Sequence, residues 1–315
     1  MNHESGGIEI RENQVSDTAI KTACWRAYHS HIDNPKIFND FLAYDLVGES
    51  EYEAFKTMYV SIFKTLAPPE YVSSFADDAA ILKLMMQSLA APALVLSRAR
   101  YSEDKLLDAL RQGVGQYVIL GAGMDTFAFR HPEVMEDLKV FEIDHPATQE
   151  FKRLRINELG WKYPSHLHLI PADFSKDNIS EALARSSYNK DCLSFFNWLG
   201  VTCYLPYDVV FAVLRTISES APAGSRLVFD YLDTDLSISE KAAPRSQEIL
   251  MMAEQAGERI ITFFNPETLA DDLDNVGFRL EENLNPSEIN QLYFNQRPDN
   301  YYACENAHFA CAVVE

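Results

Sequence analysis

The sequence lacks the features that mark a secreted protein, a membrane protein or a zinc protein. Its five cysteines are odd in number and form no CxxC pair, which argues against a disulfide framework or a metal site. No run of residues is long and apolar enough to span a bilayer. The start of the sequence is polar and acidic, without the basic stretch and apolar run of a signal peptide. We therefore expect a cytoplasmic protein that holds no metal and does not enter a membrane.

Positive charge is also scarce. The chain has 47 acidic and 27 basic residues, so its formal net charge is −20. A surface of this sign is the opposite of one that binds nucleic acid or an anionic membrane. We predict a small-molecule partner and no nucleic-acid partner, and we attribute most of the acidity to solubility. The sequence does not indicate an oligomeric state.

The 315 residues divide into two regions of different pattern. Residues 1–110 are predicted to form a helical N-terminal cap, with its clearest helix capped by Ser102 and ended by Gly113. Residues 111–315 alternate short apolar runs with helical stretches, and within them residues 234–262 are predicted to form a lid-like insertion. The apolar runs that we expect to be strands are QYVILGAG, LKVFEIDHP, LHLIPADF, CLSFFNWLG, SRLVFDYL, GFRL and HFACAVVE. This alternation predicts an α/β fold with a doubly wound, mostly parallel, seven-stranded Rossmann-like sheet, whose ligands bind at the carboxyl ends of the strands.

Glycine is scarce too, with 12 in the whole chain, so the pair in YVILGAGMDTFAFR is conspicuous. Gly121, Ala122 and Gly123 follow the first predicted strand and allow a close backbone approach to a ligand. A dinucleotide-binding loop would have a third glycine where Thr126 stands. By itself, this loop is weak evidence for a nucleotide.

Two carboxylates extend the pattern along the next two strands. Asp144 lies 23 positions after Gly121, where an acid can accept both hydroxyls of a ribose, although it could instead cap the helix that follows. Asp173, followed by Phe174, suits an adenine, because a carboxylate accepts from the exocyclic amine. A glycine turn, a ribose acid and an adenine acid in this order favour S-adenosylmethionine over NAD. The missing third glycine agrees, since S-adenosylmethionine has no pyrophosphate.

With these motifs the sequence resembles the leucine carboxyl methyltransferase family, a branch of the class I S-adenosylmethionine-dependent methyltransferases. The segments that carry the resemblance are VILGAGMDTFAFR, VFEIDHPATQEFKR, ADF and FFNWLGVTCYL. The resemblance extends from TAIKTACWRAYHSHIDNPKIFND to NPSEINQLYFNQR, which is nearly the whole chain. Within the family, the chain is most similar to bacterial small-molecule O-methyltransferases, which include polyketide-modifying enzymes.

The resemblance implies which residues bind the cofactor. Arg100 falls where the family has an arginine that pairs with the methionine carboxylate, with Arg98 as the rival candidate and Arg26 as a second basic contact. Asp125 and Arg130 match the motif and are expected to buttress the glycine loop. The implied cofactor set is Arg100, Gly121, Ala122, Gly123, Asp144, His145, Asp173, Phe174 and Leu199.

The sequence says less about the residues that bind the methyl acceptor. Members that methylate proteins carry a glutamate five residues before the tyrosine of the fourth-strand motif, and Leu199 occupies that place here. We expect substrate walls from the fourth-strand segment, the C-terminal tail and the N-terminal helices. The residues predicted to line them are Asn197, Trp198, Tyr204, Tyr293 and Arg297. The sequence identifies no catalytic base.

These observations lead to one main hypothesis and three alternatives. The main one is an S-adenosylmethionine-dependent O-methyltransferase that acts on a carboxylate or phenolic hydroxyl of a polyketide-like or other secondary metabolite. A protein C-terminal carboxyl methyltransferase is disfavoured by Leu199. A catalytically silent S-adenosylmethionine-binding protein stays open, because intact binding motifs do not establish turnover. An NAD-dependent oxidoreductase is disfavoured by Thr126 and by the position of Asp173.

Overall fold

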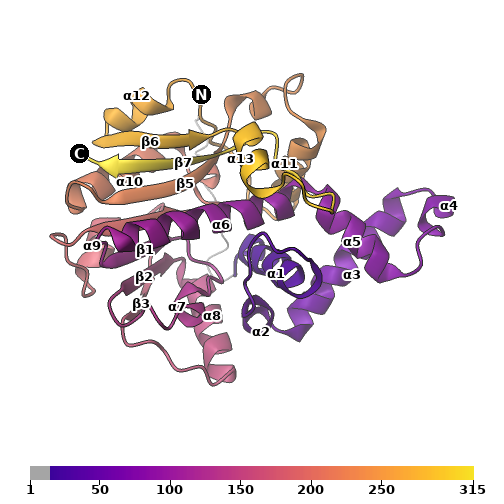
Figure 1. Cartoon of the computed structure of the whole chain (residues 1–315), viewed down its shortest axis with the longest axis horizontal. Coiled ribbons are helices and arrows are strands. Elements are labelled where there is room, and N and C mark those ends of the chain that lie inside the picture. Colours follow the sequence, from indigo (N-terminus) through magenta and orange to yellow (C-terminus); the bar gives the residue numbers. More distant parts are fainter. Residues whose placement is uncertain (1–14) are drawn as a thin grey trace, which may run out of the picture.

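A single seven-stranded sheet forms the centre of the computed structural model, which describes residues 15–315 (Figure 1). The strand order is β3-β2-β1-β4-β5-β7-β6. Strands β1 to β5 run parallel, and β7 is antiparallel to both of its neighbours. The strands are β1 (Gln116–Leu120), β2 (Lys139–Asp144), β3 (Leu167–Pro171), β4 (Ser194–Trp198), β5 (Arg226–Leu232), β6 (Phe278–Leu284) and β7 (Ala307–Val314). The predicted doubly wound, mostly parallel sheet is confirmed.

The central strands are apolar because helices cover both faces of the sheet. Every residue of β1, β4 and β7 is buried, as expected for strands with no face in solvent. Side chains alternate between the faces, so Tyr117 and Ile119 enter one apolar cluster, whereas Val118 and Leu120 enter the other. The chain order reverses between β1 and β4, and this reversal opens a crevice at their carboxyl ends.

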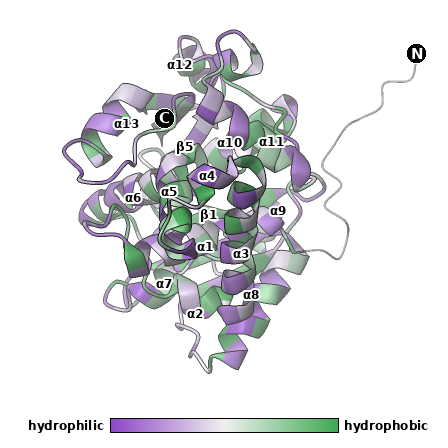
Figure 2. Ribbon diagram, turned by 90° about the vertical axis from the view of Figure 1, so that its right-hand side faces the viewer, coloured by the Kyte–Doolittle hydropathy of each residue, from purple (hydrophilic) through white to green (hydrophobic). Residues whose placement is uncertain are grey.

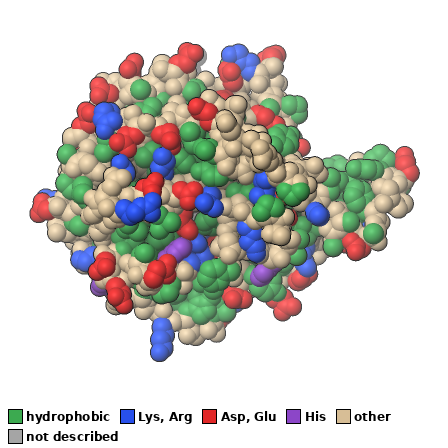
Figure 3. Space-filling model, in the orientation of Figure 1, with side chains coloured by type: hydrophobic (Ala, Val, Ile, Leu, Met, Phe, Trp, Pro, Cys, Tyr) green, Lys and Arg blue, Asp and Glu red, His purple; other side chains and the backbone are tan. Residues whose placement is uncertain are grey.

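Thirteen α-helices and two short 3-10 helices surround the sheet in the described part of the chain. The first six are α1 (Asp17–Ile32), α2 (Ala43–Val47), α3 (Glu49–Leu66), α4 (Pro69–Val72), α5 (Asp78–Ser88) and α6 (Ala90–Arg111). The remainder are α7 (Phe127–Arg130), α8 (Pro146–Glu158), α9 (Ile179–Ala184), η1 (Thr202–Tyr204), α10 (Tyr207–Ser220), η2 (Thr234–Ser237), α11 (Pro244–Gln255), α12 (Leu269–Asp274) and α13 (Pro286–Tyr293). Helices α3, α4 and α5 form an arm that projects from the body and carries hydrophobic side chains on its surface (Figures 1 and 3).

The predicted N-terminal cap is helical, but its clearest helix begins earlier than the sequence indicated. Helix α6 starts at Ala90, and Ser102 lies within it rather than at its N-cap. The Ser102 hydroxyl is used elsewhere, because it donates a hydrogen bond to Asn197 Oδ1 at 3.0 Å. Helix α6 runs across the sheet in Figure 1 and contacts β4, β5 and β7, so it is a layer of the core. The first fourteen residues of the predicted cap lie outside the described residues.

Hydropathy follows this layered arrangement. Hydrophobic segments gather at β1 and the adjoining helices in the middle of the molecule, and polar stretches occupy outer turns (Figure 2). Within residues 15–315 no single helix is long and apolar enough to cross a membrane, whereas α5 and α6, bent by 64°, meet that test as a pair.

Candidate functional site

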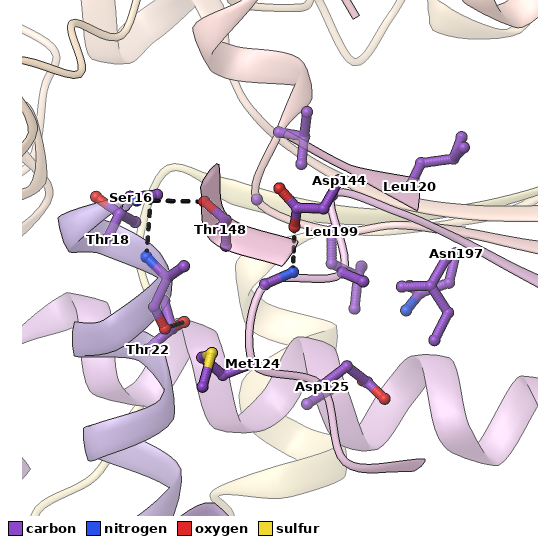
Figure 4. A pocket seen from close by; sticks show the side chains of 18 of the residues that line it. Ser16, Thr18, Thr22, Leu120, Met124, Asp125, Asp144, Thr148, Asn197 and Leu199 are labelled. Carbon is purple, nitrogen blue, oxygen red and sulfur yellow. Dashed lines mark hydrogen bonds between the residues drawn. The ribbon is translucent and has the colours of Figure 1, made fainter. Parts of the chain in front are cut away.

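A cavity of about 650 Å³ opens where the sheet order reverses. It is lined by the residues that follow β1, β2, β3 and β4, and by side chains of α1 and α6. In Figure 4, Ser16, Thr18 and Thr22 face Asp144 and Leu199 across it. This volume is typical of a site for a ligand of cofactor or drug size.

The glycine loop forms one wall of the cavity. Gly121 and Gly123 have φ angles of +74° and +50°, the left-handed region that favours glycine. A Cβ atom on Gly121 would lie 2.4 Å from Val201 Cγ2, so a larger residue would collide with the segment after β4. Gly121, Ala122 and Gly123 all line the cavity, as predicted.

Asp144 lies at the end of β2, and backbone groups hold its carboxylate in place. Its Oδ2 accepts a hydrogen bond from the Gly123 N–H (Figure 4), and its Oδ1 accepts from the His145 N–H at 2.6 Å. Burial raises the pKa of Asp144, and the two backbone donors oppose that shift. Each carboxylate oxygen keeps a second acceptor position, so both can receive ligand hydroxyls. His145 also lines the cavity, while its Nδ1 caps α8 by accepting from the Ala147 N–H at 3.3 Å.

Asp173 and Phe174 line the cavity after β3, as predicted. Asp173 Oδ1 accepts from the Ser175 N–H at 3.0 Å and from Ser175 Oγ at 2.6 Å, and its Oδ2 lies 3.2 Å from Lys176 Nζ. Burial alone would raise the pKa of Asp173, but these hydrogen bonds and the lysine hold it below its usual value. The carboxylate is therefore charged at neutral pH and fixed at the cavity edge.

The arginine at the cavity is Arg98 and not Arg100. Arg98 is largely buried, lines the cavity and pairs through Nη1 with Asp230 Oδ2 at 2.8 Å. Arg100 lies two residues further along α6, about 200° around the helix axis, so it points away. Its side chain is 49% exposed and pairs with Asp104 at 2.8 Å. Arg100, the residue predicted to contact the cofactor, therefore does not line the cavity, whereas the rival candidate Arg98 does.

Asp230 joins this arginine to the segment that follows β4. Its Oδ1 accepts from the Gly200 N–H at 2.6 Å. Gly200 has a φ angle of +67°, and a Cβ atom there would lie 2.3 Å from Arg98 Nη2. The guanidinium therefore packs directly against the Gly200 backbone, and a side chain at this position would have to displace it.

Thr126, which replaces the third glycine, belongs to a polar network beneath the loop. Its side chain is buried, and Oγ1 donates to Asp40 Oδ1 at 2.6 Å and accepts from Arg130 Nε at 2.9 Å. Arg26 lines the cavity, pairs with Asp40 Oδ2 at 3.0 Å and donates to the Met124 carbonyl at 2.7 Å. Arg130 buttresses the loop as expected.

Glu103 extends this network along α6, and the sequence reasoning did not identify it as a cavity residue. Its carboxylate accepts from Arg130 Nη2 at 2.6 Å and from His131 Nε2 at 2.9 Å. Burial alone would raise the pKa of Glu103, but the hydrogen bonds from His131 and Arg130 lower it to about 2. The same hydrogen bond to Glu103 raises the pKa of His131.

The predicted acceptor residues separate into two groups. Asn197 and Tyr204 line the cavity, as does Leu199 of the predicted cofactor set. Trp198 does not, because alternation along β4 turns it to the opposite face of the sheet, where it is fully buried in the apolar core. The other two residues that do not line the cavity are Tyr293, which packs on the α6 side of the core, and Arg297, which pairs with Asp299 at 2.6 Å.

Glu258 and Ser16 are cavity residues that the sequence did not reveal. Ser16 caps α1, and its Oγ donates to Glu258 Oε1 at 2.8 Å. The Ser16 N–H donates to Thr148 Oγ1 of α8 at 3.3 Å (Figure 4). Three segments that are distant in sequence therefore meet over the cavity, and no local motif signals such a contact.

Comparison with known proteins agrees with this geometry. The sequence profile of the leucine carboxyl methyltransferase family matches residues 19–218. YktD of Bacillus subtilis, described as a candidate S-adenosyl-L-methionine-dependent methyltransferase, is 38% identical over 306 residues, covering 96% of this chain and 99% of the relative. A Mycobacterium marinum protein with the same description is 29% identical over 238 residues, covering 75% and 70% of the two chains. The crystal structure of a DUF574 family protein from Streptomyces avermitilis shares the fold, with a TM-score of 0.57 at 10% identity, over 93% of this chain and 97% of that one.

Gly200 and Gly160 offer a matched test of the cavity geometry, because their φ angles are +67° and +66°. Each alanine substitution should lower the unfolding free energy by about 1 kcal/mol, because alanine is disfavoured in the left-handed backbone conformation. Only Gly200→Ala displaces Arg98, since no atom lies within 4 Å of the added Cβ at Gly160. We expect Gly200→Ala to weaken S-adenosylhomocysteine binding at least tenfold in calorimetry, and Gly160→Ala to leave it unchanged. Equal affinity in the two variants would contradict the assigned geometry.

The low pKa of Glu103 predicts a defined acid dependence of stability. Its folded-state pKa of about 2 lies below the unfolded value, so its contribution is present above the unfolded pKa of about 4.3 and is lost as the pH falls toward 2. Between these values, the unfolding free energy of the wild type should fall by roughly 2–3 kcal/mol more than that of Glu103→Gln. Urea unfolding at a series of pH values measures this, with the exposed Glu136→Gln as control. If the unfolding free energies of the wild type and of Glu103→Gln change in parallel with pH, the ion pair between Glu103 and Arg130 does not contribute to stability.

Proposed function

The chain belongs to the leucine carboxyl methyltransferase family, and on that premise we propose that it methylates an oxygen atom of a small molecule, a carboxylate or a phenolic hydroxyl. The reaction class follows from the family: the protein is an S-adenosyl-L-methionine-dependent methyltransferase. The acceptor is the proposed part, and the class that the sequence resemblance implies is a polyketide-like or other secondary metabolite.

The observation that carries the proposal is the order of groups around the cavity. The glycine loop, Asp144 and Asp173 follow three successive strands, and Arg98 faces them from α6. In this arrangement Asp144 would hold the ribose, Asp173 with Phe174 the adenine, and Arg98 the methionine carboxylate. The close approach of Val201 to Gly121 fits a backbone cradle, since a Cβ atom would fill that space.

The charge of the lining also fits a cationic donor. Among the described lining residues the cations are Arg26, Arg98, Arg130 and Lys176, and the acids are Asp40, Glu103, Asp125, Asp144, Asp173 and Glu258. Four positive and six negative groups give a formal net charge of −2. A partly enclosed site of this sign attracts a sulfonium and holds the neutral thioether product less strongly.

For methyl transfer, the protein needs to do little more than align the acceptor with the methyl donor. S-adenosyl-L-methionine supplies a methyl group already activated by its sulfonium. Arg98, Asp144 and the glycine loop would fix the donor, so that the acceptor oxygen needs only to be brought in line with the methyl carbon. The segment Leu199–Val201 and the bridge from Ser16 to Glu258 restrict water at the reacting centre.

A small acceptor is favoured over a protein tail by two features. Leu199 lines the cavity where protein-methylating members carry a glutamate. The Ser16–Glu258 hydrogen bond also joins two segments of the cavity lining and would narrow the path that a peptide needs. Both features support the small-molecule branch.

Removing the ribose acceptor should weaken donor binding selectively. Asp144→Asn loses the charged acceptor and should raise the calorimetric Kd for S-adenosylhomocysteine by about 10- to 100-fold, because hydrogen bonds to charged groups contribute about 1.5–3 kcal/mol. The exposed Asp137→Asn serves as control and should bind like the wild type. If the wild-type protein fails to bind S-adenosylhomocysteine, the proposed function is wrong.

Arg98 and Arg100 allow the carboxylate contact to be tested by ligand truncation. Arg98→Gln should weaken S-adenosylhomocysteine at least tenfold but change the Kd of 5′-methylthioadenosine, which lacks the amino-acid part, less than threefold. Arg100→Gln, on the outer face of the same helix, should change neither. A parallel loss for both ligands in Arg98→Gln would indicate general damage to the site instead of a carboxylate contact.

A further inference from the structure

Glu258 is a cavity carboxylate that donor binding does not use. It follows α11, which ends in a Schellman motif: the Glu258 N–H donates to the Ala253 carbonyl at 2.9 Å, and the Gly257 N–H donates to the Glu254 carbonyl at 3.0 Å. Gly257 has a φ angle of +77°, which this chain reversal requires. The motif turns the chain back toward the sheet and brings the Glu258 side chain to the cavity.

The next residues fix Glu258 beside the carboxyl end of β4. The N–H groups of Ile261 and Thr262 both donate to the Cys203 carbonyl, at 2.9 and 3.1 Å. Thr262 Oγ1 donates to the Leu205 carbonyl at 2.5 Å. The glycine loop, Asp144 and Asp173 follow β1, β2 and β3, whereas Arg98 packs on Gly200 after β4. The methionine end of the donor would therefore reach the end of β4, and the acceptor must meet the methyl group there. Glu258 therefore borders the acceptor.

The surroundings of Glu258 keep it available as a base. Its Oε1 accepts from Ser16 Oγ at 2.8 Å, and no ion pair involves it among residues 15–315. Each of the four cations in the lining is already paired with another carboxylate. None of these ion pairs offsets the charge of Glu258, so an anionic acceptor beside it would meet like charge.

The other titratable groups nearby are less suited to accept a proton. Burial, together with Cys203 and Glu258, holds the pKa of Tyr204 well above its usual value, so its phenol stays protonated. His145 Nδ1 caps α8, and Asp144 is held by two backbone N–H groups. Asp125 Oδ1 accepts from the Phe127 N–H, at the start of α7, at 2.7 Å.

We propose that Glu258 is the general base of the reaction and that the acceptor is a phenolic hydroxyl, not a carboxylate. This inference rests on the proposed function. The Glu258 carboxylate takes the hydroxyl proton while the acceptor oxygen forms a bond to the methyl carbon. The methyl–sulfur bond breaks, and its electron pair stays on sulfur. The products are the methyl ether, neutral S-adenosylhomocysteine and protonated Glu258, which loses its proton to water. Leu199, Val201 and Leu205 provide the apolar wall that a planar ring needs.

Charge selectivity tests the proposal by binding alone. The probes are 4-nitrophenol, at a pH where it is neutral, and 4-nitrobenzoate, each titrated into the S-adenosylhomocysteine complex. The wild type should bind 4-nitrophenol at least tenfold more tightly than 4-nitrobenzoate. Glu258→Gln, which keeps an oxygen for Ser16, should tighten 4-nitrobenzoate about tenfold and change 4-nitrophenol less than threefold. Glu254→Gln, at an exposed position on α11, should match the wild type.

Turnover provides a second readout that a structural role would not affect. With S-adenosylmethionine and 4-methylphenol, which stays neutral over the pH range of the assay, Glu258→Gln should lower kcat about 100-fold at similar KM and abolish the acid limb of the pH–rate profile. Glu258→Asp should restore part of kcat together with that limb. Unchanged selectivity in Glu258→Gln, a persistent acid limb, or no binding of 4-nitrophenol would each overturn the proposal. If S-adenosylhomocysteine still binds in these cases, only the role of Glu258 fails and donor binding stands.

Discussion

The ion pair between Arg98 and Asp230 connects the elements that shape the cavity. Arg98 comes from α6 and Asp230 from β5, and the same carboxylate accepts from Gly200 after β4. The Asp230 carbonyl also accepts from Thr202 Oγ1 at 3.0 Å. Removing one member of such a buried pair typically costs about 3–5 kcal/mol, because the other charge is left uncompensated. The pair therefore fixes α6 over the sheet and at the same time holds an arginine at the cavity.

Much of the core could be predicted from the sequence because buried parallel strands leave a strong local signal. Continuous apolar runs such as those of β1 and β4 identify the sheet, and Gly121, Asp144 and Asp173 follow strands at recognisable intervals. These residues occupy the cavity because every parallel strand ends at the same edge. The fold class and about half of the site residues can therefore be predicted from short-range sequence patterns alone.

The remaining site residues depend on orientation and on long-range contact. Arg98 and Arg100 are the same residue type, two positions apart, and they differ only in the side of α6 that they occupy. Asn197 and Trp198 are neighbours, yet strand alternation directs one to the cavity and the other into the core. Glu258 reaches the cavity through a helix ending and a hydrogen bond to Ser16, which is 242 residues away in sequence. Single-sequence patterns carry none of this information.

The position of β7 has a consequence for how the molecule is made. It is the last strand along the chain, yet it lies between β5 and β6, and β6 joins the sheet only through it. During synthesis on the ribosome, β6 has no strand partner until residues 307–314 have emerged. The five parallel strands, β3-β2-β1-β4-β5, can assemble before that point. The eight-residue strand β7 then pairs with both β5 and β6 and joins β6 to the sheet.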